Sequence, residues 1–241
     1  MCLIIACSII DLSCTKEVSA PKLELLIKGK FKDKPLVFAP GFSYDYFDGS
    51  KISFTRSEFF LSHLEMLNEH NEYIPFGDIY HVELQNHHIS IEKANEGYKI
   101  SLTLNQKGTF KGIRFGLGLD SLVNKKAPSD YSNDNILAIG DNYWSGWKSY
   151  IFSKTEGSLS NSTKSILFAY HSGFNESYRT IHIVKSFNLN EDQTTSFVIE
   201  IDHSKIFGNP ADYIGIYDNN IVHEGTNFLS KFMDQFQLSF N

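Results

Sequence analysis

The chain has 241 residues, of which 41% are hydrophobic and 14% aromatic, and its formal net charge is −6. This length and apolar content predict one globular domain with a sizeable core, and they exclude disorder for most of the chain. The acidic balance argues against nucleic acid as a partner, because binding phosphates requires a basic face. The 20 phenylalanines and 12 tyrosines, with many β-branched residues, favour strands over helices.

The N-terminal segment resembles the signal of a bacterial lipoprotein. A short apolar run at 3–10, too brief to span a bilayer, leads to Leu12-Ser13-Cys14 and then to polar residues. All three cysteines lie within the first fourteen residues. We therefore predict that residues 1–19 are a signal and linker, and that Cys14 (or Cys7) is acylated. The protein is then a periplasmic or outer-membrane-anchored lipoprotein of the bacterial cell envelope, held to the membrane by its lipid only. An ordinary buried first strand is the alternative.

From Lys22 onward, short runs of alternating apolar and polar residues are separated by turn residues, which is the pattern of half-buried strands. These runs fall at residues 23–27, 51–61, 80–84, 98–104, 110–119, 165–170, 180–184 and 196–201. About nine strands at hairpin-like spacing predict an all-β domain over residues 20–241. We expect an immunoglobulin-like or Greek-key β-sandwich.

Two regions depart from the strand pattern. Residues 121–141 are polar and predict a long loop, and loops of this length in a compact domain are often functional. Near the C-terminus, Phe228, Leu229, Phe232 and Phe236 recur at the spacing of one helical face. We therefore predict a single short amphipathic helix over 226–236 that closes the sandwich.

The sequence contains none of the common catalytic motifs. It lacks a glycine-rich phosphate loop, a Gly-x-Ser-x-Gly elbow, a His-Glu-x-x-His motif and a Cys-x-x-Cys motif. We therefore predict that the protein is not an enzyme and has no catalytic residues. A hydrolase that uses Asp141 and Glu156 as paired carboxylates is the alternative.

Both tryptophans, Trp144 and Trp147, lie three residues apart directly after the polar loop. Packing in the core is the ordinary role of a tryptophan. Here, however, Gly146 lies between the two tryptophans, and both fall at one junction of loop and strand. This placement favours a binding site.

Four segments, read in order, resemble the MbnP-like family of copper-binding envelope proteins, which is similar to the MopE copper protein of methane-oxidising bacteria. The first, 52–62, holds a threonine–arginine pair that leads to two aromatic residues. The second is the glycine–apolar stretch 112–121, ending in Asp-Ser and followed by Asn124. The third is the tryptophan segment 141–157, and the fourth is the aromatic–His–x–Gly strand 168–173. The resemblance carried by these four segments extends over about residues 20 to 240, which is essentially the mature chain.

The resemblance implies a β-sandwich with copper held by histidines near a tryptophan. Carried over residue by residue, it makes His171 the first ligand candidate and His223, near the expected C-terminal helix, the second. Trp144 and Trp147 match the family's tryptophan pair, with the spacing Trp-x-x-Trp in place of Trp-x-Trp. In some members a partner di-haem peroxidase oxidises that tryptophan to kynurenine, and here either tryptophan could be the one. Imidazole itself suits copper and zinc alike.

Other histidines lie in or beside the expected strands, and we expect them to face solvent without binding metal. They are His63, His81, His182 and His203.

A competing function is a surface lipoprotein that binds carbohydrate or protein through an exposed aromatic platform of Tyr143, Trp144 and Trp147. The two functions predict different geometries. His171 and His223 close together beside a tryptophan would favour metal binding, whereas scattered histidines and a shallow groove of tryptophans would favour the platform.

Overall fold

The structure is a computed structural model that describes residues 19–223 and 227–241. The predicted acylation sites, Cys7 and Cys14, lie outside these residues. The strands are β1 (Lys22–Phe31), β2 (Lys34–Pro35), β3 (Tyr44–Asp45), β4 (Lys51–Asn68), β5 (Tyr73–Gly77), β6 (Tyr80–Glu83), β7 (Tyr98–Thr103), β8 (Gly108–Leu117), β9 (Tyr143–Trp144), β10 (Ser149–Ser160), β11 (Ser165–Gly173), β12 (Arg179–Ile183), β13 (Phe187–Leu189), β14 (Thr194–Asp202), β15 (Gly208–Asn209), β16 (Asp212–Tyr213) and β17 (Ile221–Val222). The α-helices are α1 (Ile91–Glu96), α2 (Ser121–Asn124), α3 (His203–Ile206) and α4 (Asn227–Leu238).

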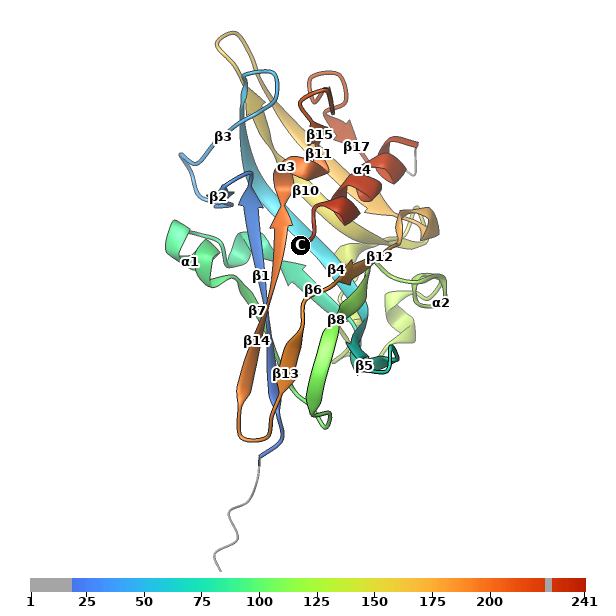
Figure 1. Ribbon diagram of the computed structural model, residues 1–241. Coiled ribbons are helices and arrows are strands. Elements are labelled where there is room, and N and C mark those ends of the chain that lie inside the picture. Colours follow the sequence, from blue (N-terminus) through green and yellow to red (C-terminus); the bar gives the residue numbers. More distant parts are fainter. Residues whose placement is uncertain (1–18, 224–226) are drawn as a thin grey trace, which may run out of the picture.

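Two main sheets form the sandwich (Figure 1). The larger has the order β12-β8-β4-β10-β11-β17, and β4 is its long central strand. In the smaller sheet, β1 lies between β14, with which it pairs in parallel, and the antiparallel strands β2 and β7. Each of the eight predicted runs overlaps a strand, and these strands are β1, β4, β6, β7, β8, β11, β12 and β14, whereas the long strand β10 was not among the predicted runs. The prediction of an all-β sandwich with a short C-terminal helix is confirmed.

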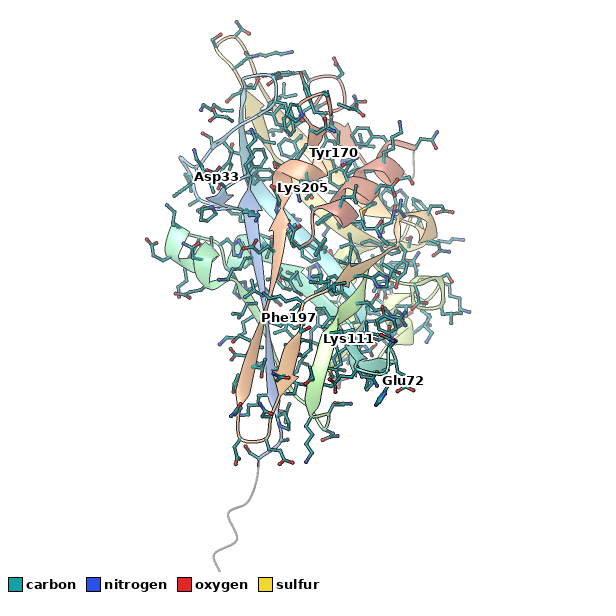
Figure 2. The ribbon with its side chains drawn as sticks, in the orientation of Figure 1. Asp33, Glu72, Lys111, Tyr170, Phe197 and Lys205 are labelled. Atoms are coloured by element: carbon teal, nitrogen blue, oxygen red, sulfur yellow. The ribbon has the colours of Figure 1, made fainter. Side chains whose placement is uncertain are left out.

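An aromatic core fills the space between the sheets, and α4 closes one end of it. The alternating burial along β1 follows the two-residue period of a strand, with each second residue buried. Phe197 of β14 and Tyr170 of β11 mark two parts of this core (Figure 2). On α4, Phe232 and Phe236 are fully buried, as the helical spacing predicts, and the Phe236 ring meets Phe59 of β4 edge to face at 5.5 Å.

The polar segment 121–142 covers the outer face of the larger sheet. It contains α2 and three short 3-10 turns at Pro128–Asp130, Ile136–Ala138 and Gly140–Asn142. A second apolar cluster lies beneath it, where Leu137 packs with Phe60, Tyr150 and Phe152. The Tyr150 hydroxyl also donates a hydrogen bond of 2.8 Å to the Leu137 carbonyl. The predicted loop is therefore anchored to the sheet, directly before the tryptophans.

Two histidines expected to face solvent are instead buried, so those predictions are wrong. His203 begins α3, where the chain turns inward after β14, so the alternation of the strand no longer sets its direction. It is fully buried, with Nε2 2.9 Å from the Ser57 hydroxyl. The His81 side chain is 9% exposed and lies close to Asn142, because the 121–142 segment covers this outer face of the sheet.

In the described part of the chain, none of the helices combines the length and the apolar character needed to cross a bilayer.

Candidate functional site

Sheet pairing brings together two histidines that are far apart in the sequence. β11 and β17 are parallel neighbours, with Tyr170 opposite Val222. The next residues in the same register are His171 and His223, so their imidazoles lie side by side. Their Nδ1 atoms are 2.9 Å apart, and their ring centroids are 4.4 Å apart.

Trp144 lies beside this pair of histidines, and Trp147 stacks on Trp144. β9 pairs with the start of β10 through a tight turn, in which the Trp147 amide donates to the Trp144 carbonyl at 3.0 Å. The turn stacks the two indoles, with centroids 4.5 Å apart and planes 19° apart. The Trp144 ring lies 6.1 Å from the His223 ring and is 40% exposed, whereas Trp147 is half-buried and packs against Phe174.

Asn124 holds the base of this turn. Its Oδ1 accepts hydrogen bonds from the Tyr150 amide at 2.9 Å and from the Ser149 hydroxyl at 3.0 Å. The Ser149 oxygen in turn accepts a hydrogen bond from the Phe174 amide at 3.1 Å. One amide side chain from α2 thus connects the start of β10 to the end of β11.

Glu156 determines which nitrogen of His171 carries a hydrogen. Its Oε1 lies 2.7 Å from His171 Nε2, and its Oε2 lies 3.6 Å from Arg56 Nε on β4. A carboxylate can only accept, so His171 Nε2 donates, and the neutral ring keeps a lone pair on Nδ1. His223 then donates its Nδ1 hydrogen to that lone pair. Moving this hydrogen to His223 Nε2 leaves two Nδ1 lone pairs facing each other.

The surroundings of His171 favour its neutral form. Burial lowers the pKa of the His171 imidazole below its usual value, and the Glu156 hydrogen bond opposes this shift. The positive charge of Lys154 nearby lowers the pKa further. Because only an unprotonated nitrogen can bind a metal ion, the net direction of the shift suits a ligand.

The donor set fits a metal ion that accepts two imidazoles from the protein. Two nitrogens 2.9 Å apart can both reach one ion at a bonding distance of about 2.0 Å. Within residues 19–223 and 227–241, no group of three or more His, Cys, Asp or Glu side chains is arranged to hold a metal ion. Glu156 contacts the far nitrogen of His171, so it acts as an orienting partner.

The four residues predicted for the site, His171, His223, Trp144 and Trp147, are therefore neighbours in the fold. Sequence reasoning did not assign a role to Arg56 or Lys154, although both lie within the matched segments. The available signal was a pair of oppositely charged residues two positions apart on each strand, Arg56 and Glu58 on β4 and Lys154 and Glu156 on β10. Only the strand register shows that these charges face one another.

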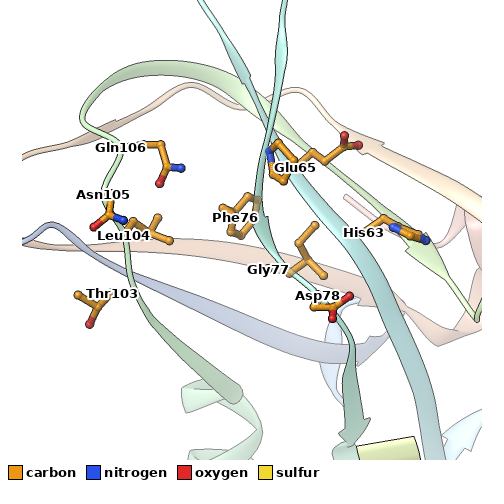
Figure 3. A pocket seen from close by; sticks show the side chains of 11 residues that line it. His63, Glu65, Phe76, Gly77, Asp78, Thr103, Leu104, Asn105 and Gln106 are labelled. Atoms are coloured by element: carbon orange, nitrogen blue, oxygen red, sulfur yellow. The ribbon is translucent and has the colours of Figure 1, made fainter. Parts of the chain in front are cut away.

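A separate cavity of about 590 Å³ lies between β4, β5 and the turn after β7 (Figure 3). Its walls carry polar side chains, among them His63, Asp78, Asn105 and Gln106. None of the four predicted site residues lines it. His63 instead pairs with Asp120, with Nε2 and Oδ2 2.6 Å apart.

Comparisons with known proteins agree with the architecture. The family model described as MbnP matches residues 20–224. Among solved structures, MbnP from Methylosinus trichosporium is similar with a TM-score of 0.52, over 85% of this chain and 81% of that chain. The two sequences are 9% identical, so this likeness concerns the fold alone. The search of curated proteins finds no match.

Proposed function

Since the chain belongs to the MbnP family, we propose that it is an exported envelope lipoprotein that binds copper through Nδ1 of His171 and of His223. The observation that carries the proposal is the 2.9 Å separation of these two nitrogens beside Trp144. The resemblance favours copper over zinc. The order of affinities of divalent first-row metals, in which copper exceeds zinc, points the same way.

The surrounding residues have clear tasks in this proposal. Glu156 holds the hydrogen on His171 Nε2, so that Nδ1 stays free for the ion. Before binding, the pair shares one hydrogen between its Nδ1 atoms, and when the ion binds this hydrogen moves to Nε2 of His223. Trp144 places an aromatic ring beside the His223 imidazole, with 6.1 Å between the ring centroids. A copper ion held by two imidazoles keeps open coordination positions for a further donor.

The metal-binding part of the proposal is tested by measuring bound copper after dialysis of the purified protein against excess Cu(II). We expect one tightly held copper per chain in the wild type and its loss in His171→Ala and in His223→Ala. His182→Ala is the matched control, because His182 is exposed on β12 and should leave copper binding intact. A wild type that binds no copper, or a His171→Ala variant that binds it normally, would refute the proposal.

The envelope location has its own test. Cys14→Ser and Cys7→Ser variants are expressed in a bacterium, and labelled fatty acid in the protein is measured together with its membrane fraction. We expect one of the two variants to lose both the lipid and the membrane association. Full labelling in the double variant would contradict the proposed anchor.

Modification of a tryptophan stays a prediction, and so does the di-haem peroxidase partner. Of the two tryptophans, Trp144 lies beside His223, so we propose it as the residue that is converted to kynurenine. Peptide mass spectrometry with fragmentation of the native protein would then show a mass gain on Trp144 and an unchanged mass of Trp147.

An aromatic platform for sugars receives less support from the geometry. The indoles of Trp144 and Trp147 stack on each other, so each ring covers part of the other. The histidines, moreover, meet beside Trp144.

A further inference from the structure

A buried ion pair lies beside the proposed copper site, and neither of its two residues is a proposed copper ligand. Lys154 on β10 lies directly between two cross-strand partners, Glu58 on β4 and His171 on β11. Its Nζ is 2.7 Å from Glu58 Oε1, and both side chains are less than 10% exposed. Two charges at this depth carry a desolvation cost that their mutual attraction offsets only with good geometry and further hydrogen bonds.

The remaining hydrogen bonds of Lys154 go to the segment that leads into the tryptophans. Its Nζ donates to Asn142 Oδ1 at 2.5 Å and to the Asp141 carbonyl at 3.4 Å. Asn142 also donates from Nδ2 to His81 Nε2 at 3.2 Å. Trp144 follows Asn142 by two residues, so the ammonium group fixes the chain immediately before the indole.

Apolar packing does not hold the segment on this side. A cavity of about 400 Å³ adjoins the ion pair, and Asp141, Asn142 and Ile139 form part of its wall. Ile139 itself is 52% exposed. With open space next to residues 139–142, the hydrogen bonds of Lys154 and Asn142 tie this stretch to the sheet between two other anchors, Leu137 before it and the β9–β10 pairing after it.

We infer that Lys154, held by Glu58, is a positioning residue that sets Trp144 against the histidine pair. Its role is to tie residues 141–142 to β10, so that the β9–β10 turn presents the stacked indoles beside His223. This inference rests on the proposed copper site for its functional meaning. The placement of the two indoles can be measured without copper, so the positioning role and the copper site can be refuted separately.

The first measurement is the circular dichroism of the metal-free protein. Trp144 and Trp147 are its only tryptophans, and two indoles stacked 4.5 Å apart should give an exciton couplet. A Trp144→Phe variant should lack the couplet, and its loss there would assign the signal to the two stacked indoles. In Lys154→Met we expect the couplet to fall at least about two-fold, because residues 141–142 lose their hydrogen bonds to Lys154 and Trp144 can then shift against Trp147.

The matched control is Lys30→Met, which removes a lysine paired with Glu200 at 2.7 Å in the smaller sheet. It should leave the couplet unchanged. If Lys154→Met fails to fold because Glu58 is left unpaired, the double variant Glu58→Leu/Lys154→Met removes both charges. Replacing a buried ion pair by apolar groups is often neutral or stabilising. We expect the double variant to fold and still to lose the couplet.

The second measurement, the quenching of tryptophan fluorescence by bound Cu(II), connects the position to the site. Quenching should be strong in the wild type and at least about two-fold weaker in the double variant at equal copper occupancy, because energy loss depends on distance. An unchanged couplet in a folded Lys154 variant would overturn the inference. A wild type that shows the couplet but binds no copper would refute the proposed function and leave the positioning role standing.

Discussion

The buried His203 predicts that acid destabilises the fold, and the size of the effect follows from its surroundings. The ring is fully buried, and burial lowers the pKa of His203 from its ordinary value in water to about 4. In the unfolded chain the imidazole regains its ordinary pKa, so the unfolded state binds the proton first as the pH falls. Stability is therefore complete above the unfolded pKa and is lost as the pH falls towards the folded value.

The expected loss from His203 alone is about 2–3 kcal/mol between about pH 7.5 and about pH 4.5. The assay is urea unfolding of the metal-free protein at both pH values, for wild type and for His203→Gln. The variant should be less stable at the higher pH, and its loss on acidification should be about 2–3 kcal/mol smaller. His182→Gln, at an exposed position, should match the wild type. Equal acid losses in wild type and His203→Gln would refute this reasoning.

Three further predictions concern single residues. Glu156→Gln should weaken copper binding about 10–100-fold in a competition titration with a chelator, because the hydrogen on His171 Nε2 loses its carboxylate acceptor. An unchanged affinity would show that Glu156 does not orient His171. Phe236→Ala should lower the free energy of unfolding in urea by about 3–5 kcal/mol, and a cost below about 1 kcal/mol would show that α4 does not stabilise the core. In Gly157→Ala the added Cβ would lie 2.0 Å from a β4 carbonyl oxygen, so we expect a loss of about 1–3 kcal/mol in the same assay. Gly140→Ala, with open space around it, should cost less than half as much.

Local patterns were enough to predict the architecture of the protein. The two-residue alternation in β1 and the helical spacing of Phe232 and Phe236 each report which face of one element is buried, and this information is contained in neighbouring residues. The proximity of the tryptophans also followed from the sequence, since residues three apart in a tight turn can stack.

The ion pairs beside the site could not be predicted in the same way. The pairing of Glu58 with Lys154 depends on the register between β4 and β10, and a shift of one residue would reverse the face of every side chain. His203 was missed for a related reason, because the inward turn at α3 is a feature of the tertiary structure. The pairing of His171 with His223 was expected from the family resemblance, whereas the residues alone left the position of both open.

The most direct test of the copper site is anomalous X-ray diffraction at the copper edge, on crystals of the protein loaded with copper. We predict one strong peak in contact with Nδ1 of both His171 and His223, beside the Trp144 ring. A peak elsewhere, for example at His63 and Asp120, or no peak between the two histidines in a copper-loaded crystal, would contradict the proposed site.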